Sequence, residues 1–242
     1  EKVECIAASG LPKINEMIEW LNFHSSTELV ALINSDILIF GDMNQITSNV
    51  ERKLLSEPFL VTSWRRNIAF DLCKNLKLDY ISDEITVKTV SGIDHGGMDL
   101  FIFRKGQFSN FPKLWVGKGL WDFEFIRQSK KQGYSILDAT DAIRLYHLDH
   151  EPYSSKEDYH KRYQSKLWKD NLRVSGHFLI GLYTLNKADY IINACSEIAL
   201  NSRINKSLGG VPSFLLGILY HILMLGYPHT TGLMHLGGRF LR

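Results

Sequence analysis

A short polar segment near the start of the chain interrupts two apolar runs and holds the first carboxylate that could bind a metal ion. Residues 29–33 are continuously apolar, Asn34, Ser35 and Asp36 follow them, and residues 37–40 are apolar again. A carboxylate fixed at the carboxyl end of a strand can hold a divalent cation where α/β folds bind ligands. A nucleotide diphosphate needs such a cation, whereas the alternative for Asp36 is a turn or cap residue.

A second carboxylate, Asp122, follows Trp121 where we expect a helix to begin. In one interpretation Asp122 caps the helix or interacts with its dipole. In the other it is a general base, because a sugar hydroxyl is a poor nucleophile until an ionised carboxylate takes its proton. The adjacent Trp121 offers a flat apolar face for a sugar ring, and the residues alone leave both interpretations open.

Two histidines, His147 and His150, are separated by two residues just after an expected strand. Neutral imidazole binds Mn²⁺ or Zn²⁺ well, and this spacing allows both rings to approach one ion on a helix or a tight turn. The alternative is a purely structural pair. A zinc hydrolase with the helical HExxH motif is disfavoured because the chain lacks that motif.

Arg65 and Arg66 form a local basic spot after Trp64 in a chain that is otherwise nearly neutral. Guanidinium groups suit phosphate oxygens, although solvated surface arginines are the common alternative. The glycine-rich phosphate loops GxGxxG and GxxxxGK[ST] do not occur, which disfavours Rossmann dehydrogenases and P-loop NTPases. The nucleophile motif GxSxG is also missing.

Helical and strand-like patterns alternate along the first part of the chain, which is typical of an α/β fold. A helix beginning near Pro12 has one apolar stripe that should cover a sheet; its members are Ile14, Met17, Ile18 and Leu21. We expect strands at residues 29–33, which should be central, and at residues 37–40, 58–62, 100–103 and 134–138. Residues 92–97 should form a loop, a helix after Asp122 should end at Gly133, and residues 185–200 should form an amphipathic helix.

The composition is that of an ordinary folded protein. The 242 residues carry a formal net charge of +2, with 45% hydrophobic, 12% aromatic and 22% charged residues, which excludes disorder, collagen and coiled coil. The nearly balanced charge lacks the electrostatic field of a nucleic-acid binder. The cysteines, Cys5, Cys73 and Cys195, form no CxxC pair, so a reducing compartment such as the cytoplasm fits best.

An apolar run at residues 211–227 is shorter than the roughly 20 apolar residues that a membrane-spanning helix needs. Peripheral membrane contact is one interpretation, because basic residues flank the run and could meet anionic headgroups. These residues are Arg203, Lys206, Arg239 and Arg242. The other interpretation is a helix that packs against the domain or against another subunit.

The order of these segments resembles the catalytic part of bacterial GT-A-type glycosyltransferases that act in surface-polysaccharide assembly. The resemblance spans roughly residues 10–195 and rests on the series of motifs rather than on any one of them. In chain order the motifs are ALINSDIL, FLVTSWRR, GMDLFIFRKG, GLWD, LDAT, HLDH and LYTLNKAD. The resemblance implies an α/β fold, a GT-A-like mixed sheet flanked by helices, with a helical C-terminal extension.

The resemblance also implies roles for individual residues. Asp36 would be the metal ligand from the DxD signature, with Asn34 in the place of its first aspartate. His147, or His150 in its place, would be the further ligand of Mn²⁺ or Mg²⁺. Asp122 would be the general base of an inverting reaction.

The remaining assignments concern the two substrates. The donor, a nucleotide sugar, would contact Asn34, Ser35, Arg65 and Arg66. The carbohydrate acceptor would contact Gly97, Asp99 and Trp121. In the family, the strands that grip the nucleotide base precede the metal signature, whereas here Asp36 comes early and the chain opens without Met. We therefore expect residues 1–152 to be a catalytic core that lacks part of its N-terminal nucleotide-binding region, and residues 153–242 to be a helical C-terminal region with an apolar tail.

The predicted function is a metal-dependent glycosyltransferase that moves a sugar from a nucleotide sugar to a polysaccharide or glycolipid acceptor. It would work in the cytoplasm, free or in association with a membrane. The alternative is a non-catalytic carbohydrate-binding or scaffolding protein with a degenerate glycosyltransferase fold, which Asn34 and the missing strands favour. A metal-dependent phosphodiester hydrolase is a third hypothesis, disfavoured because no dense cluster of metal ligands occurs in the sequence.

Overall fold

The computed structural model of the chain describes residues 10–68, 90–148, 165–175 and 183–202. His150 and the apolar run at residues 211–227 lie outside these ranges, so what we expect of them stays a prediction. No helix within the described ranges combines the length and the apolar content that crossing a membrane requires.

Helices and strands alternate along the described chain, which ends in a pair of short strands. The helices are α1 (Ile14–His24), α2 (Met43–Leu54), α5 (Trp121–Gln132) and α7 (Lys166–Ser175), with a short 3-10 helix, η3, at Leu185–Lys187. The strands are β1 (Leu29–Ile33), β2 (Ile37–Phe40), β3 (Phe59–Ile68), β4 (Val90–Arg104), β5 (Ser135–Asp138), β6 (Arg144–Leu148), β7 (Tyr190–Ile192) and β8 (Ile198–Leu200).

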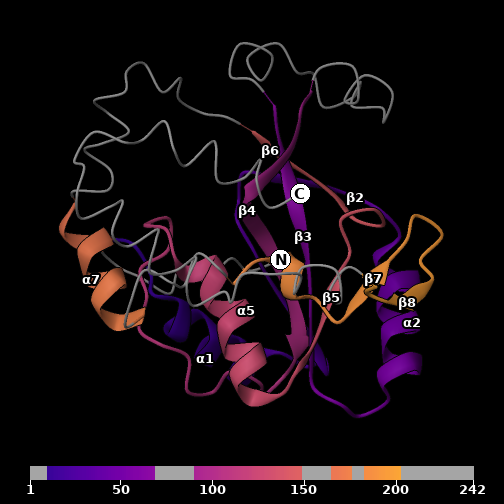
Figure 1. The fold of residues 1–242 in the computed structure, drawn as a ribbon. Helices are drawn as coiled ribbons and strands as arrows, with labels where there is room; N and C mark the ends of the chain where they lie inside the picture. The colour runs from indigo at the N-terminus through magenta and orange to yellow at the C-terminus, as the bar shows by residue number, and fades with distance from the viewer. Residues whose placement is uncertain (1–9, 69–89, 149–164, 176–182, 203–242) are drawn as a thin grey trace, which may run out of the picture.

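The strands form one mixed sheet with the long strands β3 and β4 at its centre (Figure 1). The strand order is β1-β4-β3-β5-β7-β8, and β6 lies beside β3 and also pairs with β2. β3 runs antiparallel to β4 but parallel to both β5 and β6. The predicted class of an α/β fold with a mixed sheet between helices is therefore confirmed.

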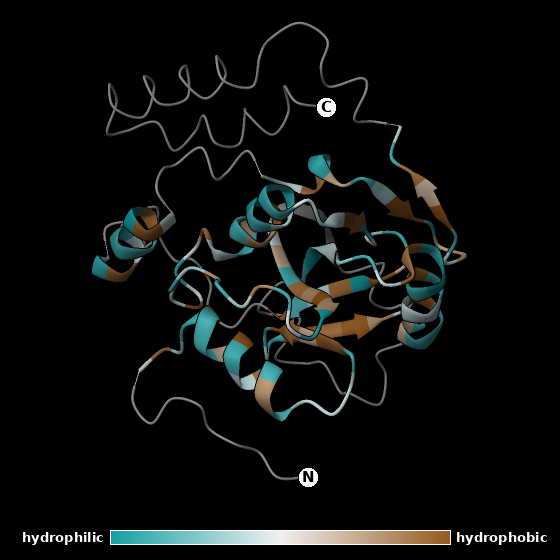
Figure 2. Cartoon of the chain, turned by 90° about the horizontal axis from the view of Figure 1, so that it is seen from below, coloured by the Kyte–Doolittle hydropathy of each residue, from teal (hydrophilic) through white to brown (hydrophobic). Residues whose placement is uncertain are grey.

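Helices cover both faces of the sheet. α1 and α5 pack on one face, where Ile18 and Phe125 contribute to the core. α2 packs on the other face through residues such as Ile46. Successive residues of β4 point to opposite faces of the sheet. Phe101 packs in the core under α1 and α5, and Ile102 packs in the core under α2. In Figure 2 the central strands are largely hydrophobic, whereas the helices around them carry both hydrophilic and hydrophobic residues.

The prediction of an amphipathic helix at residues 185–200 is wrong, because these residues form η3, β7 and β8. The side chain of Asn193 accepts hydrogen bonds from the backbone N–H groups of Cys195 (3.0 Å) and Glu197 (2.9 Å), which closes a tight turn. β-branched Ile191 and Ile192 then suit a strand, and β7 pairs with β5. Residues from the expected helical C-terminal region thus extend the sheet of the core.

Two expectations for the strands also need correction. β1 is an edge strand within the described sheet, where it pairs with β4 alone, and not the expected central strand. Residues 92–97 belong to β4 and do not form a loop. The register with β3 passes from Trp64 opposite Met98 to Arg65 opposite Asp94. Residues 95–97 therefore form a bulge, which is how a glycine-containing segment stays within a strand.

β3 changes its parallel partner halfway along its length. Residues 59–62 pair with β5 and residues 65–68 pair with β6. Thr140, in the connection between β5 and β6, hydrogen-bonds the backbone of β3 where β3 changes its partner. Its Oγ1 accepts a hydrogen bond from the Trp64 N–H at 3.1 Å and donates one to Asp138 Oδ1 at 2.5 Å. The LDAT segment therefore has a structural role in this sheet.

Replacing Thr140 with Val should reduce the free energy of unfolding by about 1–3 kcal/mol, because the buried Trp64 N–H loses its acceptor while the side-chain volume hardly changes. Urea unfolding followed by tryptophan fluorescence measures the change. Thr47→Val is the matched control, since that hydroxyl only bonds carbonyl oxygens of its own helix, with Met43 O at 2.8 Å. We expect the control to lose less than about 0.5 kcal/mol. Equal losses in the two variants would contradict the role of Thr140.

Candidate functional site

Aromatic packing beneath α5 fixes the position of Asp122. The Phe125 ring stacks on Phe101, with 4.3 Å between the ring centroids, and Trp121 meets Phe101 at 5.3 Å. Trp121 and Phe125 are four residues apart, so both point into the same core and anchor the first turn of the helix. Trp121 is only 6% exposed. The ring face that we expected to meet a sugar therefore packs within the protein.

The loop that leads into α5 is held by α7. Asn171, which is fully buried, accepts a hydrogen bond from the Trp115 N–H (2.7 Å) and donates to the carbonyl oxygens of Trp115 (3.0 Å) and Gly119 (3.1 Å). Gly119 and the N-cap residue Leu120 both have a φ of 69°. Asp122 is the second residue of the helix, so it is not the N-cap. A single asparagine in a polar helix carries no sequence signal that would predict this role of Asn171.

Burial raises the pKa of Asp122 from 3.8 to about 7, and the negative charge of Asp99 is the next largest cause. Backbone N–H groups of Phe123 and of Asp122 itself lower the pKa, and so does the positive charge of Arg65. Only 8% of Asp122 is exposed. A carboxyl group that titrates near neutral pH can accept a proton at working pH, as a general base must.

Asp99 is a buried carboxylate held from two neighbouring strands. Its Oδ1 accepts a hydrogen bond from Asn34 Nδ2 at 2.6 Å, and its Oδ2 accepts one from Arg65 Nη1 at 2.8 Å. The Asn34 backbone N–H also donates to the Asp99 carbonyl oxygen at 3.1 Å. Asp99 is only 4% exposed, so both partners compensate for the removal of its charge from water. The predicted donor residue Arg65 and the predicted acceptor residue Asp99 therefore form an ion pair with each other.

Gly97 makes room for Arg65. A Cβ atom at position 97 would lie 2.5 Å from Arg65 Nε and 2.8 Å from its Cζ, closer than side chains approach one another. The absence of a side chain at the bulge of β4 thus lets the guanidinium group reach Asp99. The motif resemblance predicts that Gly97 lines the acceptor site; what the structure shows is that its lack of a side chain serves the ion pair of Arg65 with Asp99.

Asp36 and His147 come together from segments far apart in the sequence. Asp36 precedes β2, His147 lies in β6, and these two strands pair. Asp36 Oδ2 lies 3.1 Å from His147 Nε2. His147 lies within a strand, and not just after one as we expected. Pairing of β2 with β6 is what places the imidazole beside the carboxylate.

The Asp36–His147 pair fits two ligands of one divalent cation. Neighbouring ligand atoms of an octahedral ion with bonds of about 2.1 Å are about 3 Å apart, close to the observed separation. A carboxylate and an imidazole are suitable ligands for Mn²⁺. Within the described residues, no group of three or more His, Cys, Asp or Glu side chains is arranged to hold a metal ion. Two protein ligands suffice where phosphate oxygens and waters complete the shell.

Asn34 and Asp36 connect the two groups of polar side chains. Asn34 bonds Asp99, Asp36 contacts His147, and a single residue, Ser35, separates them. Two residues of chain span at most about 7 Å, so the backbone at Asn34 lies close to the backbone at Asp36. Asp99 in turn acts electrostatically on Asp122. We call this set of side chains the polar network; its members are Asn34, Asp36, Arg65, Asp99, Asp122 and His147.

Two predicted donor residues lie outside the polar network. Arg66 lies over the ring of Tyr146, with 5.9 Å from Cζ to the ring centroid. Tyr146 and His147 are successive strand residues and point to opposite faces, so Arg66 lies on the face opposite His147. Ser35 is exposed in the turn between β1 and β2.

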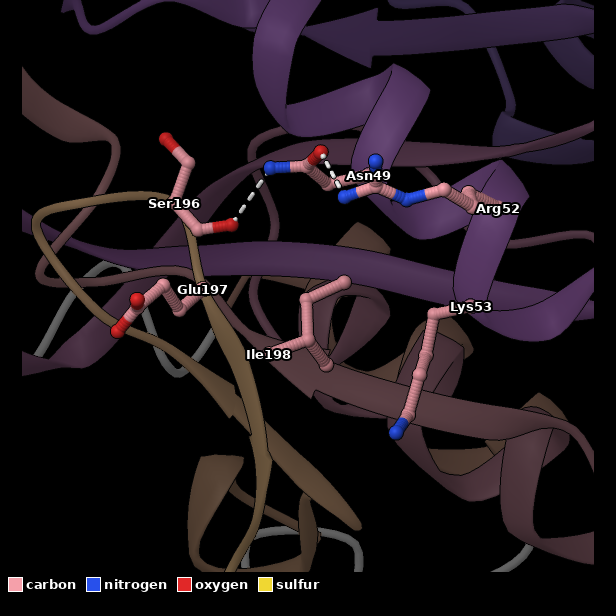
Figure 3. Close-up of a pocket in the computed structure, with 6 residues that line it drawn as sticks. All are labelled: Asn49, Arg52, Lys53, Ser196, Glu197 and Ile198. Atoms are coloured by element: carbon pink, nitrogen blue, oxygen red, sulfur yellow. Dashed lines mark hydrogen bonds between the residues drawn. The ribbon is translucent and has the colours of Figure 1, made fainter.

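A pocket of about 230 Å³ lies between α2 and the β7–β8 turn (Figure 3). Asn49 Nδ2 donates to the Ser196 carbonyl oxygen at 2.8 Å, and Asn49 Oδ1 accepts from Arg52 at 3.0 Å. These contacts tie α2 to the turn. The complete lining consists of Asn49, Arg52, Lys53, Ser196, Glu197 and Ile198. None of the residues predicted to act in catalysis or in binding lines this pocket.

Comparison of the chain with protein-family models, with curated proteins and with solved structures finds no match. Function must therefore be argued from the polar network itself. The resemblance to GT-A glycosyltransferases stays an expectation that rests on the sequence motifs.

Changing Asn34 to Asp, which would complete a DxD signature, should destabilise the protein by about 1–3 kcal/mol at pH 7. A carboxylate would then face Asp99 Oδ1 where the amide now donates at 2.6 Å. The loss should shrink at pH 4, because one of the two carboxyl groups can then carry a proton. Urea unfolding at both pH values measures it. Ser35→Asp adds the same charge at an exposed site and should change stability by less than about 0.5 kcal/mol; an equal loss there would refute the argument.

The stability of the protein should fall as pH rises from about 4 to about 7. The pKa of Asp122 is raised to about 7 in the folded protein, so between these values the folded protein binds more protons than the unfolded chain. Asp122→Asn removes this dependence and should gain, relative to the wild type, on the order of 4 kcal/mol between pH 4 and pH 8. Denaturant unfolding at several pH values tests this. Asp141→Asn, at an exposed position, should run parallel to the wild type.

Proposed function

We propose that this chain is the catalytic and acceptor-binding part of a metal-dependent glycosyltransferase. It transfers a sugar from a nucleotide sugar to a carbohydrate acceptor, either a polysaccharide or a glycolipid. The observation that carries the proposal is the polar network. Asp36 lies 3.1 Å from His147, and Asp122, whose pKa is about 7, lies within the field of Asp99. The motif resemblance gives Asp36, His147 and Asp122 roles that their surroundings support.

In the proposed reaction, the oxygen of an acceptor hydroxyl attacks the anomeric carbon of the nucleotide sugar. Its proton passes to the Asp122 carboxylate, the bond from the anomeric carbon to the diphosphate oxygen breaks, and the diphosphate leaves with the electron pair. Attack from the side opposite the leaving group inverts the anomeric centre. The reaction needs the deprotonated form of Asp122, so the rate should rise as pH increases through about 7.

Asp36 and His147 would hold a divalent cation, Mn²⁺ or Mg²⁺, which supplies positive charge to the departing diphosphate. Arg65 is engaged by Asp99, so its charge stabilises the network rather than the leaving group. The aromatic core under α5 holds Asp122 in place, and this fixed position accounts for part of the catalysis. Orientation and charge, rather than covalent chemistry, are therefore what the protein supplies.

The test measures sugar transfer from a panel of nucleotide sugars to oligosaccharide and glycolipid acceptors with Mn²⁺ present. We expect turnover with at least one pair of substrates and loss of turnover on chelation by EDTA. Asp122→Asn should lower kcat by about 10²–10⁴-fold, the usual contribution of a general base. Transfer that persists in Asp122→Asn would remove it as the base, and binding of carbohydrate without transfer to any acceptor would favour a non-catalytic binding protein.

The metal ligands are tested separately by calorimetric titration with Mn²⁺ and a nucleoside diphosphate. Asp36→Asn and His147→Gln should each weaken this binding by about tenfold or more, whereas Asp122→Asn should leave it unchanged. His24→Gln is the matched control, because His24 is an exposed imidazole that stacks on Trp20 of α1. Equal affinity in the wild type and in both ligand variants would contradict the metal site.

A further inference from the structure

The contacts of Asn34, Arg65 and Asp99 differ from what substrate ligands require. Both carboxylate oxygens of Asp99 already accept hydrogen bonds, from Asn34 at 2.6 Å and from Arg65 at 2.8 Å. The Asp99 side chain is 6% exposed and the Arg65 side chain 23% exposed. A sugar hydroxyl could reach Asp99 only through the small part of its carboxylate that these bonds and the surrounding protein leave exposed. Both oxygens of Asp99 are thus engaged by neighbouring side chains.

The amide at position 34 follows from the same contact. An aspartate there could not donate to Asp99, and two carboxylates 2.6 Å apart would repel each other. Asn34 also keeps its backbone N–H bonded to the Asp99 carbonyl oxygen at 3.1 Å. The asparagine is therefore the side chain that Asp99 requires, and it need not be a weakened remnant of a metal ligand.

Asp99 and Arg65 are also the charged groups whose fields reach Asp122. Asp99 lies on β4 and Arg65 on β3, and their charges act on Asp122 in opposite directions, with that of Asp99 the stronger. On its own helix, Asp122 meets backbone N–H groups, while the nearby Glu124 is fully buried and bonded to Arg127 and Gln128. The charges that face Asp122 within the described residues therefore come from the strands.

We propose that Asn34, Arg65 and Asp99 form one positioning unit that contacts neither donor nor acceptor and acts on the reaction only through Asp122. Among the charges that act on Asp122, that of Asp99 is the strongest and adds to the effect of burial. Arg65 moderates that charge, and Asn34 and Gly97 hold the pair in place. The consequence for catalysis rests on the proposed function, because it needs Asp122 to be the base. The effect on Asp122 itself does not.

The test follows the side-chain carboxyl carbon of Asp122 by NMR in the whole chain labelled with ¹³C-aspartate, between pH 4 and pH 9. The signal is assigned by its loss in Asp122→Asn. Asp99→Asn should lower the pKa of Asp122 by about one unit or more, because the opposing charge is removed and Arg65 remains. Arg65→Gln should shift it in the opposite direction. Asp141→Asn, which makes the same change in net charge at an exposed site, should leave it in place.

A pKa of Asp122 that is the same in Asp99→Asn and in the wild type, in variants that still unfold cooperatively in urea, overturns the proposal. If Asp99→Asn does not fold, Arg65→Gln becomes the test. A pKa of Asp122 that does not rise in Arg65→Gln then overturns the proposal. Binding of Mn²⁺ with a nucleoside diphosphate should change by less than about twofold in either variant, and a tenfold loss would make these residues donor ligands instead. The NMR titration and the binding measurement do not require sugar transfer. Their results can therefore be interpreted even if the proposed glycosyltransferase activity is absent.

Discussion

The buried charge of Asp99 is the constraint that determines the residue types at positions 34, 65 and 97 of the candidate site. A carboxylate that is 4% exposed needs partners, and it takes an amide from the end of β1 and a guanidinium group from β3. Each partner constrains the sequence elsewhere. Position 34 must donate a hydrogen bond, and position 97 must lack a side chain so that Arg65 can pass. One charge thus accounts for the residue types at several points of the candidate site.

The sheet brings these residues together because β3 changes its partner. Its first half pairs with β5, which leads away toward β7 and β8, and its second half pairs with β6. The change leaves room for the connection that contains Thr140, whose hydroxyl bonds the Trp64 N–H. β6 can then pair with β2 as well, and that pairing sets His147 beside Asp36. The contact between the imidazole and the carboxylate is therefore a product of topology.

The sequence predicts local features well and long-range contacts poorly. The apolar stripe of α1, the strand before Arg65 and the stop of α5 at Gly133 follow from local patterns, and the structure confirms them. The β7–β8 pair could not be predicted in this way, since its pairing with β5 outweighs a helical pattern of apolar residues. Likewise, Arg65 and Asp99 were identified as separate substrate contacts. Their ion pair depends on the register of β3 with β4, which cannot be predicted from the sequence of either segment alone.

Asp122 and Glu124 show why residue type alone does not define a base. Both are carboxylates in the first turn of α5 and both are buried, with Glu124 fully so. Glu124 is bonded by Arg127 and Gln128 of its own helix, so it stabilises α5. Burial, and after it the charge of Asp99, raises the pKa of Asp122 to about 7. Glu124 therefore bonds residues of its own helix, whereas Asp122, two residues earlier, is influenced by charges on the strands. The capacity to exchange a proton at neutral pH thus arises first from the burial of Asp122 and second from the charge of Asp99 on β4.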